Sequence, residues 1–423
     1  MSDAPPSAAV CREERLALLA AAAGYFCLLC GYYMLRPIRE ALAIQANVRN
    51  NLVLFLAVLA VSCVLLPIYW QIVRRTPRGR LLWFVAVPFV AVFLGLFVGL
   101  SRAPADRILA FAFFVALTSA NYFLVSIFWS AMSDVWRPEL AKRFYGYVAA
   151  GGSAGALLGP GIVTATVRDL GPAPLIVIAC LFILATAVLA SVARSTLRRS
   201  AHGATVPDGA IPVGGSAWDE LARLARTPYL LGIGGVIVIG QIIGAFMYNE
   251  QQNFAKSAFD TIADRTAFFA NLEIAVNLLA LFFQVVVVTW LTRRGSVALS
   301  LTAMPVLVGL SFIALGLFPV ASVFLATQVL RRAADYGLGK PPREMLFTVL
   351  SPEGKFKSKS LIDTVIQRAG DCLGQGLHLL VAQIGIAGLA WLCFALCCGM
   401  AGATRVLGRA FDTRQRAGSA SAA

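Results

Sequence analysis

Charged residues are scarce in this sequence. Only 13% of its 423 residues are charged, whereas 59% are hydrophobic, and the mean hydropathy is +0.77. A soluble domain of average composition carries about 25% charged residues. The shortage of charge excludes an ordinary soluble globular protein and predicts a chain that crosses a lipid bilayer several times.

Histidine is almost absent as well. The two histidines, His202 and His378, are too few and too scattered to indicate a metal site. Most of the nine cysteines lie inside apolar runs. Cys27 and Cys30 have the spacing of a metal or redox pair, but without a second pair in the middle of an apolar run they indicate packing. We therefore expect neither a metal nor a cofactor.

The sequence also lacks the marks of an enzyme and of a nucleic-acid-binding protein. No nucleophile, base and acid form a recognisable set, and no phosphate-binding glycine loop is complete. The Gly-Gly-Ser-Ala-Gly segment at 151–155 resembles such a loop, but it lacks the Lys-Ser/Thr ending and lies in an apolar run. The net charge of +15 includes no basic run interleaved with aromatic residues. We expect no catalytic activity and no nucleic-acid partner.

The sequence contains many long apolar runs, which are separated by short polar loops. Runs of about twenty residues predict membrane-spanning helices, and the weak alternating pattern of a β-barrel is missing. The expected fold is all-α, with about twelve transmembrane helices. The predicted spans are 16–35, 51–73, 82–100, 108–130, 144–165, 173–194, 228–249, 267–291, 296–317, 319–338, 361–383 and 384–404. The first run has no convincing cleavage site, so we interpret it as a retained helix and not a signal peptide.

The loop charges predict an orientation. With the N-terminus in the cytoplasm, most of the lysines and arginines outside the apolar runs fall in cytoplasmic segments, as the positive-inside rule requires. We expect both termini in the cytoplasm, a bacterial inner membrane as the location, and a monomer.

A long polar stretch divides the chain. Residues 195–227 begin with a segment rich in Gly, Pro, Ala and Ser, which is typical of a flexible linker. We predict an N-terminal six-helix half at 1–194, a cytoplasmic linker at 195–227 and a C-terminal six-helix half at 228–423. Two six-helix halves joined in this way fit the major facilitator architecture.

A faint repeat supports the two halves. A Pro-Glu-basic loop precedes a helix that contains Gly151, Gly155 and Gly159, and a similar loop precedes a helix that contains Gly370 and Gly374. Glycines four apart form a smooth stripe, so another helix can pack closely against each set. Ordinary packing in a membrane bundle would explain the glycines alone, but the matched loops favour repetition.

The segment around Arg36 and Arg39 is the most unusual part of the sequence. Both arginines follow an apolar run, three residues apart, and Glu40 lies one turn from Arg36. Charges at this depth usually face a bundle interior or a wet cavity, which makes the pair a candidate anion site. The alternative is that both side chains reach the lipid headgroups.

Other charges fall inside or at the ends of the predicted spans. Asp134 ends the fourth span, Glu250 ends the seventh, and Glu273 lies within the eighth. Arg343 follows the tenth, beside two prolines. Since an unpaired charge in hydrocarbon is costly, we expect several of these groups to pair.

Two further pairs have the spacing of contacts within one helix. Arg368 with Asp371, and Arg332 with Asp335, are each three residues apart. Such pairs often hold membrane bundles together.

Three stretches carry a resemblance to a known family. They are Tyr-Tyr-Met-Leu-Arg-Pro-Ile-Arg-Glu-Ala-Leu at 32–42, Phe-Trp-Ser-Ala-Met-Ser-Asp-Val-Trp-Arg-Pro-Glu-Leu-Ala-Lys-Arg-Phe at 128–144, and Lys-Pro-Pro-Arg-Glu-Met-Leu-Phe-Thr-Val-Leu at 340–350. With these the chain resembles the ATP/ADP translocases, nucleotide transporters with a major-facilitator-like fold. The resemblance implies an antiporter that binds ATP and works by alternating access, with the substrate between the halves.

The resemblance also implies roles for particular residues. Arg39 matches a lysine on which the family's exchangers depend, Asp134 matches an acid after the fourth span, and Glu250 matches a second acid. A basic residue that the family has late in its sequence is matched either by Arg343 or by a lysine at 355–359. The implied substrate-binding set is therefore Arg36, Arg39, Asp134, Glu250 and Arg343.

Two alternatives stay open from the sequence. One is a proton-coupled transporter of the major facilitator type that carries another organic anion. The other is a membrane scaffold or sensor that keeps the fold but transports nothing.

Overall fold

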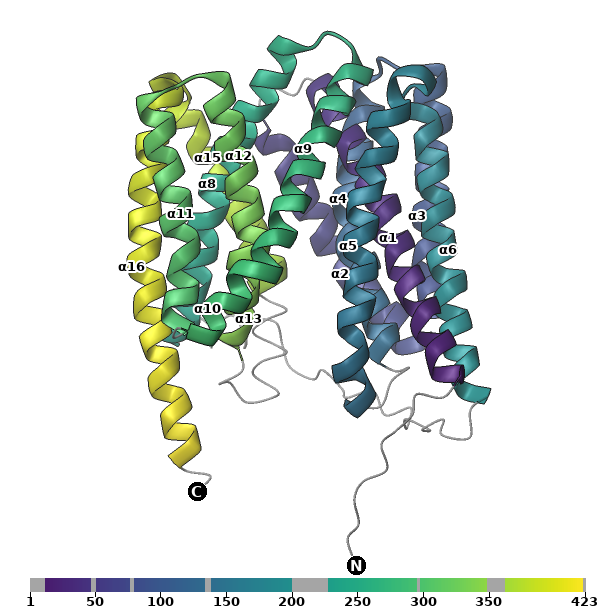
Figure 1. Ribbon diagram of the computed structural model, residues 1–423. Helices are drawn as coiled ribbons and strands as arrows, with labels where there is room; N and C mark the ends of the chain where they lie inside the picture. Colours follow the sequence, from purple (N-terminus) through teal and green to yellow (C-terminus); the bar gives the residue numbers. More distant parts are fainter. Residues whose placement is uncertain are drawn as a thin grey trace, which may run out of the picture. The chain divides into compact units, whose positions relative to one another are not determined.

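The computed structural model describes residues 12–46, 51–76, 80–133, 138–199, 227–294, 297–347 and 362–420 (Figure 1). Every regular element in these ranges is a helix. The first part of the chain forms α1 Arg12–Ala46, α2 Leu52–Arg75, α3 Leu81–Arg102, α4 Arg107–Ser133, α5 Pro138–Leu170 and α6 Pro172–Arg199. The second part forms α8 Pro228–Ala258, α9 Ile262–Phe282, η1 Phe283–Val288, α10 Thr289–Arg294, α11 Val297–Leu317, α12 Ala321–Ala334, η2 Asp335–Gly339, α13 Lys340–Met345, η3 Ile362–Ile366, α15 Gln367–Val381, η4 Ala382–Ile384 and α16 Gly385–Ala420.

Many of these helices can cross a membrane. In the described part of the chain, nine are long and apolar enough by length and composition, and one of the nine, Gln367–Arg414, contains two of the predicted spans. The assessed apolar part of α2 is shorter, and α12 has 14 residues and contains two arginines. The prediction of an all-α membrane protein is confirmed.

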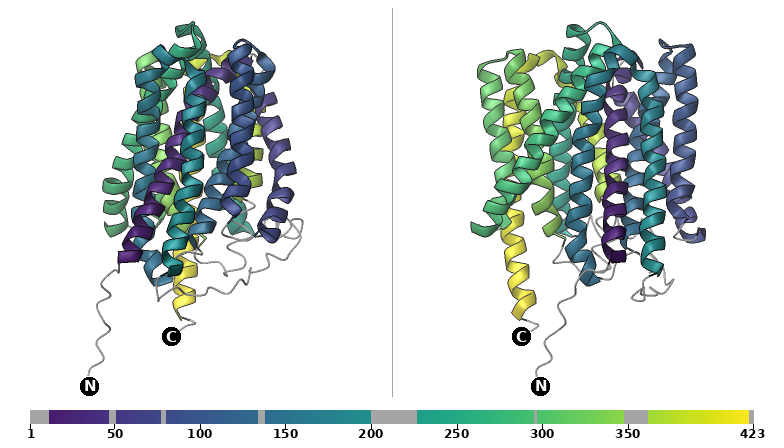
Figure 2. Two further views of the ribbon diagram at one scale, coloured as in Figure 1. Left: turned by 90° about the vertical axis from the view of Figure 1, so that its right-hand side faces the viewer. Right: turned by 45° about the vertical axis from the view of Figure 1, so that its right-hand side comes forward.

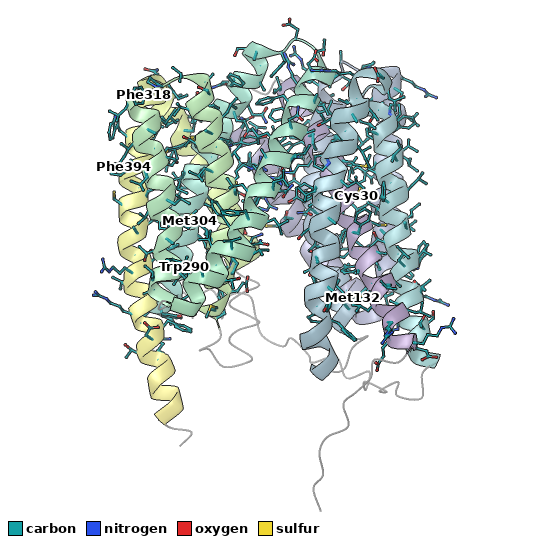
Figure 3. All side chains as sticks on the ribbon, viewed as in Figure 1. Cys30, Met132, Trp290, Met304, Phe318 and Phe394 are labelled. Atoms are coloured by element: carbon teal, nitrogen blue, oxygen red, sulfur yellow. The ribbon has the colours of Figure 1, made fainter. Side chains whose placement is uncertain are left out.

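Large apolar side chains remain exposed along the helices. Leu380, Phe318 and Trp290 are 78%, 64% and 51% exposed; Figure 3 marks the latter two. A soluble monomer seldom leaves so many large apolar groups in water. This apolar surface is suited to contact with lipid chains.

The chain forms two compact units. Unit 1 comprises 1–46, 61–210 and 261–273, and unit 2 comprises 47–60, 211–260 and 274–423. The start of α2 therefore belongs to unit 2, and the start of α9 belongs to unit 1. The predicted boundaries at 194 and 228 stay a prediction, and most of the predicted linker lies outside the described residues.

Helix α1 is the centre of unit 1. It runs along α5 and α6, which is visible in Figure 2, and also contacts α4. The close approach of α5 depends on its glycines, because a Cβ on Gly155 would lie 2.2 Å from the backbone oxygen of Phe26. Gly151 and Gly159 make the same kind of contact with α1, so the predicted glycine stripe is confirmed.

Unit 2 repeats this packing with α8 and α15. A Cβ on Gly374 would lie 2.7 Å from the Cβ of Ala245, and one on Gly370 would lie 3.2 Å from the Cβ of Gln241. The turn after each glycine-bearing helix is also the same: Gly171 precedes α6 with φ +74°, and Gly385 begins α16 with φ +69°. This backbone conformation favours glycine. The structural match supports the predicted repeat.

Unit 2 also contains π-helical segments, and η1 packs against η2. In η2 the amide of Lys340 bonds to the carbonyl of Asp335, five residues back, and Pro341 has no amide hydrogen to donate. The Tyr336 carbonyl accepts a hydrogen bond of 3.1 Å from the Gln284 side chain on η1. A membrane helix tolerates proline where a neighbouring helix satisfies the freed backbone group in this way.

Most helices continue beyond the predicted spans, and two of these extensions concern the predicted site residues. The prediction ended the first span at residue 35, but α1 continues through Pro37 to Ala46, so Arg36 and Arg39 lie within the helix. The prediction placed Glu250 at the end of the seventh span, but α8 continues to Ala258. Hydropathy gives the length of the apolar run, and a helix can continue past that run where polar residues have buried partners.

Candidate functional site

Arg39 is buried inside unit 1, and its guanidinium has partners from two helices. It is 9% exposed. One Nη forms an ion pair with Glu40, and the other donates to the Thr118 hydroxyl on α4 at 3.2 Å. Its Cζ also lies 5.1 Å from the ring centroid of Phe114, one turn before Thr118. Charge, hydroxyl and ring together hold this cation away from lipid headgroups.

Arg36 pairs with a residue far along the chain. Its Nη1 lies 3.3 Å from Oε2 of Glu273 on α9, a residue that is 2% exposed. Two further contacts hold the start of α9 to α5: Thr164 donates to Asn271 at 3.2 Å, and Arg168 pairs with Asp264 at 3.2 Å.

The sequence placed Glu40 one turn from Arg36, but the structure pairs Glu40 with Arg39 and supplies Arg36 with Glu273. We call Arg36, Arg39, Glu40, Thr118 and Glu273 the arginine cluster. Its two cations and two carboxylates balance, so it has no net charge while empty.

This balance determines what the arginine cluster can do chemically. Guanidinium groups bind phosphate and carboxylate oxygens through paired hydrogen bonds. Here Glu40 and Glu273 each form an ion pair with one nitrogen of an arginine, and in the part of the chain that the structure describes the Nε atoms of Arg36 and Arg39 are buried without a hydrogen-bond partner. An incoming oxyanion would have to displace a carboxylate from one guanidinium. The arginine cluster is therefore suited to exchange one anion for another.

Glu250 lies in unit 2, where it contacts a histidine. Its Oε1 is 3.4 Å from Nε2 of His378 on α15, and the two side chains are 23% and 9% exposed. The ring of Phe246 lies one turn earlier on α8, with its centroid 6.0 Å from that of His378. A carboxylate and an imidazole at this distance can share or transfer a proton.

Buried carboxamides surround the Glu250 position. Asn249 donates to the Gln375 side chain at 2.8 Å and to the Ala245 carbonyl at 2.7 Å, and it accepts from Asn51 at 2.7 Å. Asn249 and Gln375 are 8% and 2% exposed. These amides join α8, α15 and the start of α2 by neutral hydrogen bonds.

A second set of amides leads to an arginine. Gln328 on α12 donates to the Gln251 side chain at 2.5 Å and accepts from Nε of Arg331 at 3.1 Å. Gln328 and Gln251 are 1% and 3% exposed. We call Asn249, Gln375, Gln251 and Gln328 the amide network.

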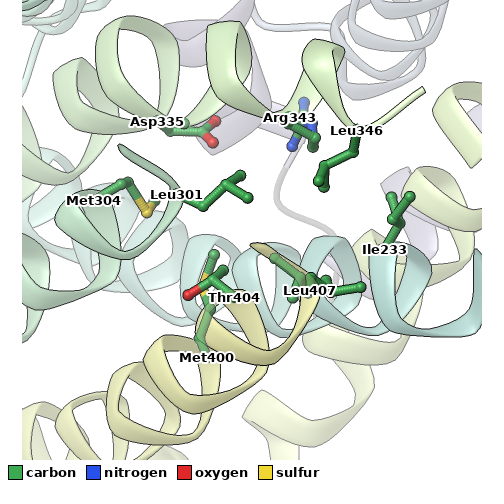
Figure 4. A pocket seen from close by; sticks show the side chains of 11 residues that line it. Ile233, Leu301, Met304, Asp335, Arg343, Leu346, Met400, Thr404 and Leu407 are labelled. Atoms are coloured by element: carbon green, nitrogen blue, oxygen red, sulfur yellow. The ribbon is translucent and has the colours of Figure 1, made fainter. Parts of the chain in front are cut away.

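Arg343 lies elsewhere in unit 2. Together with Asp335 it lines a mainly apolar pocket whose other walls come from α8, α11 and α16 (Figure 4). Ile233 of α8 also lines this pocket, and it lies roughly 25 Å along the helix from Glu250 at 1.5 Å per residue. The structure therefore does not bring Arg343 and Glu250 together.

Two predicted positions cannot be placed. Asp134 lies outside the described residues, and so do the lysines at 355–359 that were the alternative to Arg343. The roles of all five predicted site residues stay predictions.

Sequence reasoning missed several residues that the structure brings to these sites. Thr118 had no signal, because one hydroxyl in an apolar run is unremarkable. His378 was dismissed as isolated, although it lies one turn after Gly374 on the packed side of α15. Arg331 was not included in the predicted site.

The predicted pair within α15 is present. Arg368 Nη1 lies 3.4 Å from Oδ2 of Asp371. Over the described ranges, no group of three His, Cys, Asp or Glu side chains has the arrangement of a metal site.

Comparison with known proteins identifies the fold. No family model and no curated protein sequence matches the chain. Among solved structures, it is similar to a peptide transporter of the POT family bound to alafosfalin (TM-score 0.67, 13% identity, 93% of this chain and 95% of the other). It is also similar to a bacterial homologue of the iron transporter ferroportin, with a TM-score of 0.63 and 15% identity over 93% of this chain and 98% of the other. A bacterial homologue of the lysosomal transporter Spinster matches with a TM-score of 0.55 and 15% identity over 95% of each chain.

At such low identity the likeness establishes the fold alone. The chain is an all-α, multi-pass membrane protein of the major facilitator type. The similarity covers more than nine tenths of both chains, so it is not confined to one of the two units.

Proposed function

We propose that the protein is a secondary transporter that carries a nucleotide by alternating access, most simply by exchanging ATP for ADP. The observation that supports this proposal is the arginine cluster, in which Arg36 and Arg39 lie within a membrane-spanning helix and are held by carboxylates. The fold adds support, since the solved structures with this architecture named above are described as transporters or their homologues.

The arginine cluster explains how exchange could be coupled to binding. When the site is empty, Glu40 and Glu273 balance the charges of the two guanidinium groups. When a phosphate binds, its oxygens take over those contacts and release a carboxylate. A cargo-free site with two unpaired cations would be costly inside a bundle, so the carboxylates allow the empty state to exist.

The membrane potential sets a condition on ATP import. Exchange of external ATP for internal ADP moves about one negative charge inward, against an inside-negative potential that costs about 2.3 kcal/mol per 100 mV. The proposed location is the inner membrane of a bacterium, with both termini in the cytoplasm and one chain as the transporting unit. An importer there requires an external ATP pool or a compensating ion.

Uptake into proteoliposomes tests the proposal. Labelled ATP is supplied to vesicles that contain the full-length protein and are preloaded with ADP or with buffer. We expect faster uptake into the ADP-loaded vesicles, and loss of that uptake in Arg39→Gln. Arg168→Gln is the matched control, because Arg168 forms an exposed pair with Asp264. If preloading has no effect and unlabelled ATP does not compete, exchange of nucleotides is ruled out.

The contact between Glu250 and His378 favours a second candidate, a proton-coupled transporter for another organic anion. A carboxylate and an imidazole in contact inside a bundle are the kind of groups that carry protons in transporters. A proton-coupled transporter would show uptake that follows an imposed pH gradient and is lost in the Glu250→Gln or Asp134→Asn variant. Uptake that ignores the gradient and depends on internal ADP would reject this candidate in favour of exchange.

A further inference from the structure

Arg331 differs from the paired arginines of the interior. Arg36, Arg39 and Arg368 each contact a carboxylate. Arg331 lies on α12 and is partly exposed, and its hydrogen bond goes to the neutral amide of Gln328. Within the described residues, no carboxylate lies at ion-pair distance from its guanidinium, and Asp335, one turn later, acts on it only at longer range.

The guanidinium of Arg331 is nevertheless held in a defined orientation. Its Nε donates to Oε1 of Gln328 at 3.1 Å, and the Gln328 amide is fixed in turn by its 2.5 Å bond to Gln251 on α8. Both glutamines are almost fully buried. The arginine is therefore positioned by two amides that have little freedom to move.

Helix α8 leaves space for the guanidinium at Gly244. A Cβ built on Gly244 would lie 3.4 Å from Nη1 of Arg331, so the side chain lies directly over a residue that has none. Because Nε is occupied by Gln328, the remaining hydrogen-bond donors are the two Nη groups. Two parallel donors of this kind match the spacing of oxygens in a phosphate or carboxylate.

The cost of an unpaired charge in a membrane supports the same role for Arg331. A cation inside a membrane bundle is expensive unless a counter-charge or water satisfies it. A structural arginine is normally given a carboxylate, as Arg368 is given Asp371 on the same helix. An oriented, partly exposed arginine with a neutral partner is instead suited to a counter-charge that arrives and leaves.

We propose that Arg331 is an anion-binding residue of unit 2, which binds a phosphate or carboxylate group of the cargo through its two Nη groups. Gln328 and Gln251 are positioning residues that orient the Arg331 guanidinium. The identification of the anion with a nucleotide phosphate rests on the proposed function, but the site itself does not.

Equilibrium binding to the purified full-length protein tests the proposal. The probes are ATP, inorganic tripolyphosphate and citrate, and the readouts are titration calorimetry and ligand-induced thermal shift. We expect Arg331→Gln to weaken binding of ATP and tripolyphosphate about 10- to 100-fold, the loss typical of a charge-assisted pair of hydrogen bonds. Arg168→Gln, which removes an exposed arginine of unit 1, should bind like the wild type.

Two further variants separate an anion site from a structural role. Arg331→Lys keeps the charge but loses the planar fork, so its binding should fall between wild type and Arg331→Gln. Gln328→Leu keeps the arginine but removes the group that aims it, and should weaken binding about 3- to 10-fold. If Arg331→Gln does not fold, these two variants decide the question.

The outcomes for the two proposals are distinguishable. If ATP binds the wild type and all the Arg331 and Gln328 variants equally, the Arg331 site is wrong and the nucleotide proposal stands. If citrate binds in an Arg331-dependent manner while ATP and tripolyphosphate do not bind, the site is right and the nucleotide proposal is wrong. If the wild type binds none of the probes, both are rejected.

Discussion

The central helices of the two units pack in the same way but carry different polar side chains. In unit 1, α1 packs on the glycines of α5 and carries ionised residues, with Arg36 and Arg39 held by carboxylates. In unit 2, α8 packs on the glycines of α15 and carries carboxamides, among them Asn249 and Gln251. Similar packing therefore does not imply similar sites. On α1 the buried polar side chains are mainly paired charges, whereas on α8 they are mainly carboxamides beside Glu250.

The backbones differ as well. Among the described residues, π-helical segments occur in unit 2, in η1, η2 and η3, whereas the helices described in unit 1 are α-helical throughout. A π-helical segment often marks a functional site or a place where a helix bends. The contact of η1 with η2 makes unit 2 the part of the molecule in which we expect deformation.

The largest expected effect tests the shared packing. Gly155→Ala places a Cβ 2.2 Å from a backbone oxygen of α1, and a backbone contact cannot relax like a side chain. We expect little or no folded protein, measured as the monodisperse fraction after detergent extraction. Gly161→Ala on the same helix is the control, because nothing lies within 4 Å of its Cβ position. Equal yields would show that the close α1–α5 contact is not needed.

The next effect tests the balance of charge in unit 1. Arg39→Gln leaves Glu40, which is 4% exposed, without its cation, and breaking such a buried pair costs about 3–5 kcal/mol. The double variant Arg39→Gln/Glu40→Gln should recover most of the melting temperature but not ATP uptake. Recovery of uptake in the double variant would mean that Arg39 has a structural role only.

A smaller effect is expected at the π-helical contact in unit 2. Gly337→Ala places a Cβ 2.6 Å from the Cβ of Phe283 and 2.8 Å from the Ala280 carbonyl, so η1 and η2 must separate. We expect a destabilisation of about 1–3 kcal/mol, typical of overpacking, and faster hydrogen exchange at Asp335–Gly339. Unchanged exchange there would argue against a deformable contact.

The smallest effect concerns the surface of unit 1. Arg168 and Asp264 form an ion pair in which the side chains are 69% and 38% exposed. Exposed pairs contribute about 0–1 kcal/mol, so Arg168→Gln should change the melting temperature and the uptake rate little. A large loss of uptake would mean that the start of α9 depends on this pair, and the contrast between buried and exposed charges would have to be revised.

The sequence predicted the spans and the glycine stripes well, because both are local patterns. Hydropathy finds a run long enough for a bilayer, and glycines four apart share a helix face. It did not show that Gly155 faces α1 or that Gly374 faces α8, because the partner helix is set by the tertiary fold.

The contents of the sites were harder to predict. Glu273 was recognised as an intramembrane charge, but nothing in the sequence connects it with Arg36, since their pairing depends on where α9 begins to pack against unit 1. The ends of α1 and α8 lie beyond the predicted spans because hydropathy marks the apolar run and not the end of the helix. The prolines at 341 and 342 follow a π-helical segment in which Gln284 donates to the Tyr336 carbonyl, a contact that depends on the packing of η1 against η2.

The central claim is that the carboxylates of the arginine cluster hold the place of the cargo's anion. The affinity of purified Glu273→Gln for ATP tests it most directly, with Arg36→Gln measured beside it. Removing the competing carboxylate should tighten ATP binding about 3- to 10-fold, whereas Arg36→Gln should weaken it. ATP affinity that falls in Glu273→Gln as it does in Arg36→Gln, at equal thermal stability, would contradict the account.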